Sequence, residues 1–227
     1  MTYEYLLFDA DDTLFDFDQG SHNAFREAMN EHGIASSDAD YDRYAAINLA
    51  LWKQFEKGEI EKETILTKRF RDFIAISGWN ADPDAVNESY KAAISHQNIL
   101  MPNALEVLSA LKARGYRLFI ITNGDAAIQH KRLATSPITP LIEKTFISEE
   151  IGYAKPAKAF FDAVECAIEG FDKTKALVIG DSESSDMLGA QNAGIDACFF
   201  SPKNAALPDG ISAKYRIRAL CELLVLL

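Results

Sequence analysis

Residues 5–13 read YLLFDADDT and combine an apolar run with a cluster of aspartates. Its first part, Tyr5–Phe8, is a short apolar run of the length and residue type that favour a buried β-strand. Its second part, Asp9 to Thr13, places three aspartates directly after that run. In α/β proteins, ligands bind beyond the carboxyl ends of strands. The stretch therefore predicts a strand that ends in a functional site.

Later apolar runs show that this strand is one of several. They are followed by polar or glycine-rich turns and span Arg117–Thr122, Lys144–Ser148, Ala176–Gly180 and Ala197–Phe200. Between them, one amphipathic segment begins after Pro102 and ends near Gly115, and another begins after Pro156 and ends near Gly170. Proline at a helix start and glycine at its end are the expected signals. The alternation of strands and helices predicts an α/β core, with a parallel sheet covered by helices on both faces.

Residues 18–98 break this alternation, because they contain no run that resembles a strand. Apolar side chains recur instead at helical spacing, in one stripe of Tyr44, Ile47, Leu51 and Phe55 and a second of Leu66, Phe70, Phe73 and Ile74. The sequence thus predicts a core domain of residues 1–17 and 99–227. An all-helical domain of residues 18–98 is inserted into the first crossover of its sheet.

Composition bounds the class of protein. The chain has 227 residues, is 48% hydrophobic and carries a formal net charge of −11. These values are typical of a globular protein and exclude a disordered or collagen-like chain. The acidic balance predicts no nucleic-acid partner, because binding phosphate backbones over a broad surface needs clustered Lys and Arg. A small phosphorylated ligand needs only a few local cations and remains compatible with this charge.

The cysteines and the chain ends predict the compartment. Cys166, Cys198 and Cys221 form no Cys-x-x-Cys pair, and their odd number favours free thiols in a reducing compartment. The first residues do not form a signal peptide, and the apolar stretch from Ala219 to Leu227 is too short to span a bilayer. We expect a cytoplasmic protein without a membrane partner. Whether it is a monomer or a homodimer stays open.

Four polar clusters follow the predicted strands. They are Asp9 to Thr13, Thr122-Asn123-Gly124, Ala154-Lys155-Pro156, and Gly180-Asp181-Ser182 with Asp186 five residues after Asp181. Because the carboxyl ends of parallel strands meet near a topological switch point, we expect the four clusters to converge on one crevice. Each cluster alone is also compatible with an ordinary turn or helix cap.

The charges of the converging residues predict a metal ion. Two unit charges 4 Å apart repel by about 4 kcal/mol at an effective dielectric near 20. As many as five aspartate carboxylates from the four clusters would meet in this crevice, and Lys155 supplies one positive charge. Carboxylate oxygens of this kind suit Mg²⁺. Sharing of protons between neighbouring carboxyl groups is a second way to relieve the repulsion.

The same residues suit phosphoryl transfer. Asp9 can attack phosphorus and form an aspartyl-phosphate. Asp11 can protonate the leaving oxygen and later deprotonate the attacking water. The candidate catalytic residues are thus Asp9, Asp11, Thr122 and Lys155, and the candidate phosphate-binding residues are Asp12, Thr122, Asn123, Gly124 and Lys155.

Taken in order, these motifs resemble those of the haloacid dehalogenase (HAD) superfamily of aspartyl phosphohydrolases. The resemblance rests on Asp9-x-Asp11-x-Thr13, Thr122, Lys155-Pro156, and Gly180-Asp181 with Asp186, and it covers the whole chain. It implies a Rossmann-like core with residues 18–98 as the helical cap, Asp9 as nucleophile and Asp11 as acid/base. It also implies Mg²⁺ held by Asp9, Asp181 and the main-chain carbonyl of Asp11, with Asp186 acting indirectly or through a water.

A narrower resemblance points to a substrate. The segments Phe8 to Phe15, Ile47-Asn48 with Leu51-Trp52, Gly58-Glu59-Ile60, and Ile147 to Gly152 are similar to those of the YjjG-type pyrimidine 5′-nucleotidases. This resemblance implies a small-molecule phosphomonoester substrate, a nucleoside 5′-monophosphate with pyrimidines preferred.

Other functions remain open at this stage. A sugar-phosphate phosphatase or phosphomutase would use the same motifs, although phosphomutases of the superfamily usually have Gly where Asp12 stands. The dehalogenase branch lacks the acid/base aspartate, so Asp11 argues against dehalogenation. A phosphorylated receiver domain and a catalytically inactive binding module are the alternatives from other classes.

Overall fold

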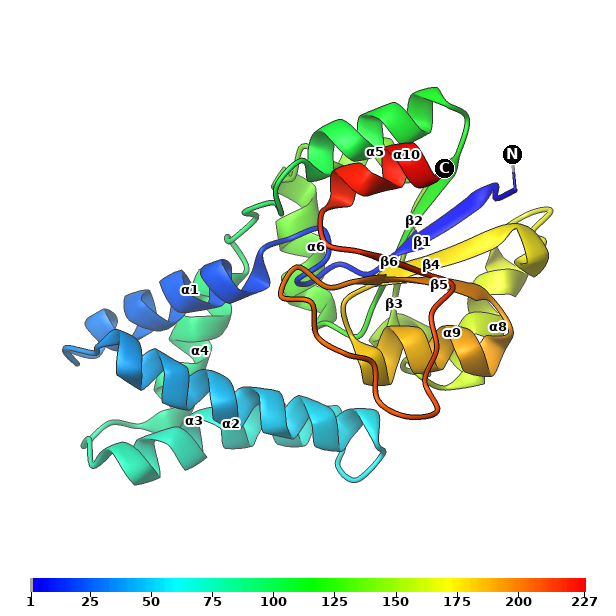
Figure 1. The fold of residues 1–227 in the computed structure, drawn as a ribbon. Coiled ribbons are helices and arrows are strands. Elements are labelled where there is room, and N and C mark those ends of the chain that lie inside the picture. Colours follow the sequence, from blue (N-terminus) through cyan, green and yellow to red (C-terminus); the bar gives the residue numbers. More distant parts are fainter. Residues whose placement is uncertain (1) are drawn as a thin grey trace. The chain divides into compact units, whose positions relative to one another are not determined.

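The computed structural model describes residues 2–227, which fold into two compact units. One unit comprises residues 2–16 and 98–227, and the other comprises Phe17–Gln97 (Figure 1). The domain boundaries predicted from the sequence, 17/18 and 98/99, each lie one residue from these. We call the first unit the core and the second the cap.

A six-stranded sheet organises the core. Every pair of neighbouring strands is parallel, and their order is β3-β2-β1-β4-β5-β6. The strands are β1 (Tyr5–Phe8), β2 (Arg117–Thr122), β3 (Lys144–Ile147), β4 (Ala176–Gly180), β5 (Asp196–Phe200) and β6 (Tyr215–Ile217). β1 lies at the centre, with β2 on one side and β4 on the other, which makes its carboxyl end a topological switch point.

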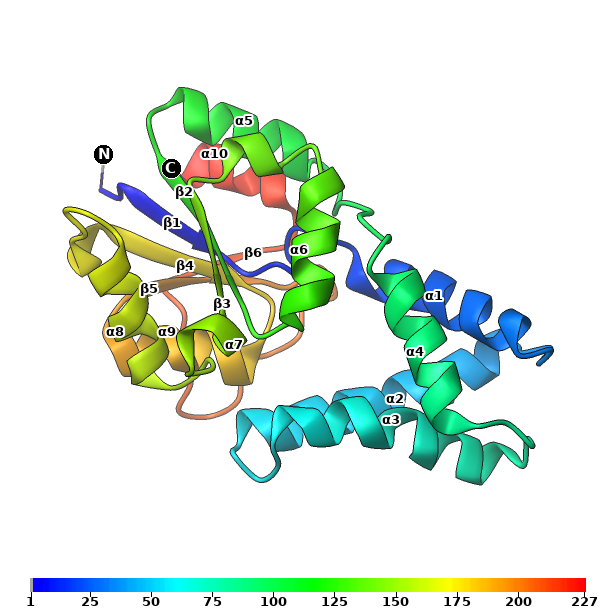
Figure 2. The ribbon, with the colours of Figure 1, turned by 180° about the vertical axis from the view of Figure 1, so that it is seen from behind.

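Alternate side chains of each strand pack on opposite faces of the sheet. On β1, Leu6 and Phe8 belong to one apolar cluster, and Tyr5 and Leu7 belong to the other. Figures 1 and 2 show α5 and α10 covering one face, and α8 and α9 covering the other. The predicted α/β, Rossmann-like architecture with helices on both faces is confirmed.

The two core helices predicted from the sequence are present as α5 and α8. α6 begins after Asp125, whose side chain accepts a hydrogen bond of 3.0 Å from the Ile128 amide and so caps the helix. The helical elements of the core are α5 (Ala104–Ala113), α6 (Ala126–Thr135), η1 (Thr139–Leu141), α7 (Ser148–Ile151), α8 (Lys158–Ala167), η2 (Lys173–Lys175), the π-helical turn η3 (Glu183–Met187), α9 (Leu188–Ala193), η4 (Leu220–Glu222) and α10 (Leu223–Leu226).

The cap consists of helices, as predicted: α1 (Phe17–Glu31), α2 (Asp38–Glu56), α3 (Lys62–Ser77) and α4 (Pro83–Ile94). Aromatic side chains form its interior. The rings of Tyr44 and Phe70 stack with their centroids 4.6 Å apart, and the ring centroids of Phe25 and Tyr44 are 5.1 Å apart. The predicted stripes hold for Tyr44, Leu51, Phe70, Phe73 and Ile74, which are buried, whereas Ile47, Phe55 and Leu66 are partly exposed.

Three details of the strands differ from the sequence prediction. β6 was not predicted, because Tyr215–Ile217 is a three-residue edge strand with exposed Arg216 at its centre and forms no apolar run. Ser148 begins α7 and does not extend β3, and β5 begins one residue earlier than expected, at Asp196. None of these changes affects β1, β2 or β4, at whose ends Asp9, Thr122 and Asp181 lie.

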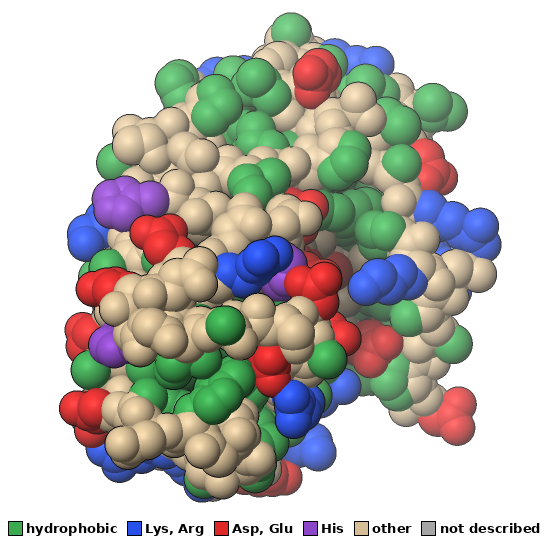
Figure 3. Space-filling model, turned by 90° about the vertical axis from the view of Figure 1, so that its left-hand side faces the viewer, with side chains coloured by type: hydrophobic (Ala, Val, Ile, Leu, Met, Phe, Trp, Pro, Cys, Tyr) green, Lys and Arg blue, Asp and Glu red, His purple; other side chains and the backbone are tan. Residues whose placement is uncertain are grey.

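The cysteines, the helix lengths and the surface charges bear on the predicted compartment and partners. Cys166, Cys198 and Cys221 are free thiols, the first and third exposed. None of the helices within residues 2–227 combines the length and apolar character needed to cross a lipid bilayer. On the face shown in Figure 3, Lys and Arg side chains are interspersed with Asp and Glu. The cytoplasmic location, the lack of a nucleic-acid partner and the oligomeric state stay predictions or open questions.

Candidate active site

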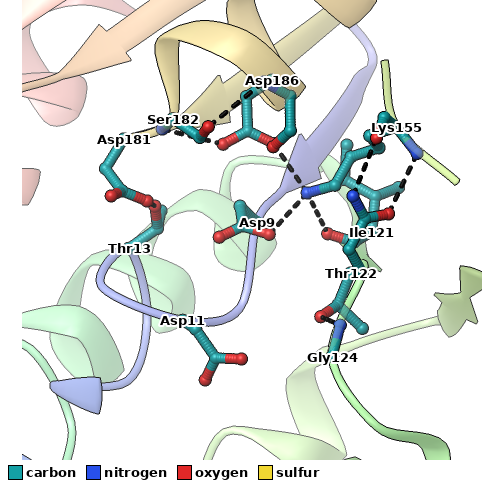
Figure 4. Close-up of polar contacts among 12 residues, drawn as sticks. Asp9, Asp11, Thr13, Ile121, Thr122, Gly124, Lys155, Asp181, Ser182 and Asp186 are labelled. Carbon is teal, nitrogen blue, oxygen red and sulfur yellow. Dashed lines mark hydrogen bonds and ion pairs between the residues drawn. The ribbon is translucent and has the colours of Figure 1, made fainter. Parts of the chain in front are cut away.

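Three neighbouring strands bring the predicted clusters together. Phe8, the last residue of β1, pairs with Ile120 of β2 and Ile179 of β4. Asp9 and Asp181, which follow β1 and β4, therefore lie at strand ends adjacent to Thr122, the last residue of β2. Figure 4 shows Asp9 between the segments that carry Lys155 and Asp181. The structure thus gathers residues that are up to 177 positions apart in the sequence, from Asp9 to Asp186 (186 − 9 = 177).

Lys155 lies at the centre of the polar contacts. Its ammonium group donates to Asp9 Oδ1 at 2.5 Å, to Asp186 Oδ1 at 2.6 Å and to the Ile121 carbonyl at 3.0 Å. Lys155 is 1% exposed, so all three contacts are shielded from bulk water. Its three donors are therefore satisfied by two carboxylates and a main-chain oxygen.

The side chain of Asn123 fixes the position of the Lys155 backbone. Its Nδ2 donates to the Lys155 carbonyl at 2.8 Å, and its Oδ1 accepts from the Lys155 amide at 2.9 Å. This reciprocal pair joins the loop after β2 to the loop that precedes α8. The peptide bond between Lys155 and Pro156 is cis. Asn123 was predicted to bind phosphate, and sequence reasoning missed this clamp.

Burial and neighbouring charges together determine the protonation of Lys155 and Asp9. Burial alone would lower the pKa of Lys155, but the carboxylates of Asp186 and Asp9 raise it above the ordinary lysine value. Burial raises the pKa of Asp9 well above its usual range; the Lys155 ammonium opposes this rise, while the charges of Asp186 and Asp11 add to it. One cation therefore does not offset the negative charge around Asp9.

Three carboxylates form a group that suits a cation. Oxygen atoms of Asp9, Asp181 and Asp186 all lie within 4.8 Å of one another. Burial raises the pKa of Asp181 well above the aspartate value, and the charges of Asp9, Asp186 and Asp12 raise it further. A divalent cation with oxygen ligands would relieve this repulsion, and the donor set fits such an ion.

Asp186 is already engaged on both oxygens. Oδ1 accepts from Lys155, and Oδ2 accepts from the Ser182 amide at 3.1 Å. Its carboxylate also lies against Gly180, where a Cβ atom would come 2.2 Å from Oδ2. Gly180 is therefore required for close approach of Asp186 to the end of β4. These contacts favour an indirect part for Asp186 in holding a cation.

The loop after β2 presents the hydroxyl of a buried threonine. Thr122 is 1% exposed, and its Oγ1 accepts from the Gly124 amide at 2.9 Å. The hydroxyl hydrogen of Thr122 thus remains available as a donor. Gly124 also has no room for a side chain, because a Cβ atom there would lie 2.2 Å from Nε2 of Gln129.

The loop after β1 is a tight turn built around Asp12. Asp12 adopts a left-handed conformation with φ 56°, and its amide donates to the Phe15 carbonyl at 2.8 Å. Thr13 Oγ1 donates to Asp181 Oδ1 at 3.1 Å and so ties this loop to the end of β4. Because the Asp12 amide already has this partner, the predicted contact of Asp12 with phosphate stays a prediction.

Asp11 is held by two residues that sequence reasoning missed. Gln129 Nε2 donates to Asp11 Oδ2 at 2.6 Å, and Arg132 pairs with Asp11 Oδ1. Both residues come from α6 and are 1% exposed. The signal in the sequence was two polar side chains three positions apart on the helix that follows Thr122-Asn123-Gly124, a spacing that places them on one helix face.

Comparison with known proteins identifies the family of the chain. The model of the haloacid dehalogenase-like hydrolase family matches residues 6–200. The chain belongs to this family. It is 35% identical over 224 residues to the pyrimidine 5′-nucleotidase PynA of Streptococcus pneumoniae, covering 99% of this chain and 94% of that protein. It is 31% identical over 223 residues to the pyrimidine 5′-nucleotidase YjjG of Escherichia coli, covering 98% and 97%.

A solved structure extends the comparison to three dimensions. The HAD hydrolase YfnB of Bacillus subtilis, solved with bound magnesium, superposes with a TM-score of 0.94. It is 32% identical, and the match covers 100% of this chain and 99% of that chain. The predicted family is confirmed, and the chain is an enzyme, a phosphatase of the HAD family.

Proposed function

We propose that this HAD phosphatase is a Mg²⁺-dependent 5′-nucleotidase that hydrolyses nucleoside 5′-monophosphates, pyrimidines preferred, through an aspartyl-phosphate on Asp9. The observation that carries the mechanism is the buried Asp9 carboxylate at the switch point of the sheet, in contact with Lys155 and beside Asp181. The full-length similarity to PynA and YjjG supports the substrate class.

In the first step, an Asp9 oxygen attacks phosphorus and the bond from phosphorus to the 5′ oxygen of the nucleoside breaks. Asp11 gives its proton to that leaving oxygen, so that a neutral alcohol departs. Lys155 offsets charge on the phosphoryl oxygens, and its contact with Asp9 holds the nucleophile in place.

In the second step, Asp11, now ionised, accepts a proton from a water molecule that attacks phosphorus. The bond between Asp9 and phosphorus breaks, which releases inorganic phosphate and restores both carboxyl groups. The Thr122 hydroxyl and the amides of the Asn123-Gly124 turn are the proposed donors to the phosphoryl oxygens. Asp12, in the loop after β1, is a further proposed phosphate-binding residue.

The acidic group is the proposed metal site. Asp9, Asp181 and the main-chain carbonyl of Asp11 would hold Mg²⁺, with Asp186 acting through its contacts with Lys155 and Ser182. When bound, Mg²⁺ supplies positive charge that stabilises the phosphoryl oxygens. An anionic nucleotide can thus bind to a protein of net charge −11.

A substrate panel tests this proposal. Purified protein would be assayed for released phosphate with nucleoside 5′-monophosphates, sugar phosphates and acyl phosphates, with Mg²⁺ and with a chelator. We expect the highest kcat/KM for pyrimidine nucleoside monophosphates, and no turnover in the chelator. No turnover of any compound would refute the phosphatase mechanism, and a preference for sugar phosphates would refute the nucleotidase assignment.

A further inference from the structure

The Asp11 carboxylate has a separate donor on each of its oxygens. Gln129 Nε2 donates to Oδ2 at 2.6 Å, and Arg132 Nη1 pairs with Oδ1. A carboxylate turns freely about its last bond when nothing holds it, and two donors on different oxygens fix both its direction and its plane. The orientation of Asp11 is therefore set by α6, at sequence separations of 118 and 121 residues.

The two donors are themselves held in place. Gln129 and Arg132 are each 1% exposed. The guanidinium carbon of Arg132 lies 4.4 Å from the centroid of the Phe15 ring, a cation–π contact with a residue of the same loop as Asp11. The amide of Gln129 fills the space at Gly124 that a Cβ atom would occupy. Side chains fixed in this way can transmit a defined geometry to Asp11.

The direction in which Asp11 is held has a chemical consequence. In Figure 4 its side chain points away from Lys155 and Asp181, while Asp9 lies beside both. A fourth carboxylate side chain among Asp9, Asp181 and Asp186 would add repulsion and could be taken up as a further ligand of a cation. Held apart from them, Asp11 keeps lone pairs free for proton transfer.

We propose that Gln129 and Arg132 are positioning residues that orient the Asp11 carboxylate for both proton transfers and act on catalysis through Asp11 alone. This inference rests on the proposed function, because it requires Asp11 to act as acid/base. A carboxylate that is misplaced by about 1 Å can cost on the order of 10²-fold in rate. The cost falls on steps that need its proton.

The test compares two leaving groups. A nucleoside alkoxide is a poor leaving group that needs a proton from Asp11, whereas p-nitrophenolate leaves without one. The variants are Arg132→Met and Gln129→Met, the second of which retains the pair between Arg132 and Asp11. We expect kcat/KM for a nucleoside monophosphate to fall about 10- to 100-fold, and kcat/KM for p-nitrophenyl phosphate to fall less than about 3-fold.

A double-mutant cycle and a control complete the experiment. In an Asp11→Asn background, Arg132→Met and Gln129→Met should cause no further loss of nucleotide turnover, because the group through which they act is gone. Lys131→Ala, exposed on the same helix, should behave as wild type. Thermal unfolding of every variant shows which of them keep the native fold.

The outcomes that overturn the inference are distinct from failure of the proposed function. An equal fall with both substrates, an unchanged nucleotide rate, or a further loss in the Asp11→Asn background would each remove the positioning role. If Asp11→Asn itself shows no preference between leaving groups, the acid/base assignment of Asp11 fails, and this inference fails with it.

Discussion

At the scale of single residues, the site depends on one buried lysine between carboxylates. Lys155 contacts Asp9 at 2.5 Å and Asp186 at 2.6 Å, and it is almost fully buried. Removing one partner from a buried ion pair leaves uncompensated charge, which costs far more than the loss of an exposed pair. Lys155 therefore contributes to both the fold of the site and its chemistry.

Lys155→Met tests this dual role. We expect kcat to fall about 10²- to 10³-fold, because the positive charge that offsets the phosphoryl oxygens and the partner of Asp9 are both lost. The free energy of unfolding should also fall, by about 3–5 kcal/mol if Asp9 and Asp186 stay charged. Steady-state kinetics and chemical denaturation measure the two effects.

Lys158→Met is the matched control for this change. Lys158 lies three residues further on and forms an exposed pair with Asp162, so its loss should cost less than about 1 kcal/mol and leave kcat unchanged. Equal effects of the two substitutions would contradict the central place given to Lys155.

At the scale of elements, strand ends and the turns after them determine where the site residues lie. β1, β2 and β4 are adjacent, so their carboxyl ends deliver Asp9, Thr122 and Asp181 to one place. Because Gly180 has no side chain, the end of β4 can contact the Asp186 carboxylate, and there is no room for a Cβ atom between them. The turn geometry is therefore as important to the site as the acidic residues.

Gly180→Ala tests the close approach at the end of β4. The new methyl group would lie 2.2 Å from Asp186 Oδ2 and 2.4 Å from its Cγ, so Asp186 must move and loosen its contact with Lys155. We expect kcat to fall by roughly 10²-fold, as for other displacements of about 1 Å. Kinetic assays at saturating substrate measure this loss.

Gly194→Ala separates this displacement from a general loss of stability. Gly194 has φ +69° with no atom within 4 Å of the added Cβ, so the substitution strains only the backbone. It should lower the free energy of unfolding by about 1 kcal/mol and leave kcat unchanged. A Gly180→Ala enzyme as active as the Gly194→Ala enzyme would contradict the argument.

How far the sequence predicts these elements depends on the range of the contacts. The strand Tyr5–Phe8 and the polar residues after it follow from local pattern, and the parallel order places strand ends together. The contacts of Asp11 with Gln129 and Arg132 join residues more than 100 positions apart. The spacing of Gln129 and Arg132 places both on one helix face, but it does not identify Asp11 as their partner. The Asn123 clamp on Lys155 and the short edge strand β6 were missed for the same reason, since tertiary packing specifies them.

At the scale of the whole molecule, the net charge of −11 includes a buried group that opposes folding in the absence of a cation. The folded-state pKa of Asp181 is raised above the ordinary value of 3.8, mainly by burial. Between these two pKa values the folded protein binds more protons than the unfolded chain. Stability therefore decreases as the pH rises from about 4 through the raised pKa.

Asp181→Asn tests this linkage in a chelator. At pH 7 the variant should be more stable than wild type, by on the order of 1 kcal/mol for each pKa unit removed. The difference should shrink as the pH falls toward 4, where the wild-type carboxyl is protonated, and added Mg²⁺ should stabilise the wild type at pH 7 but not the variant. Thermal melts across this pH range measure the effect, with exposed Asp162→Asn as control. A variant that is less stable than wild type in the chelator at pH 7 would contradict the assignment.

The proposed mechanism requires Asp9 to carry the phosphoryl group, and this covalent intermediate can be trapped. Asp11→Asn lacks the base for the second step, so it should accumulate aspartyl-phosphate when mixed with p-nitrophenyl phosphate and Mg²⁺, because p-nitrophenolate leaves without a proton from Asp11. Acid quenching, borohydride reduction and peptide mapping by mass spectrometry would then find homoserine in place of aspartate at residue 9. Detection of homoserine at another aspartate, or an unmodified Asp9 in enzyme that has released p-nitrophenolate, would show that Asp9 is not the nucleophile.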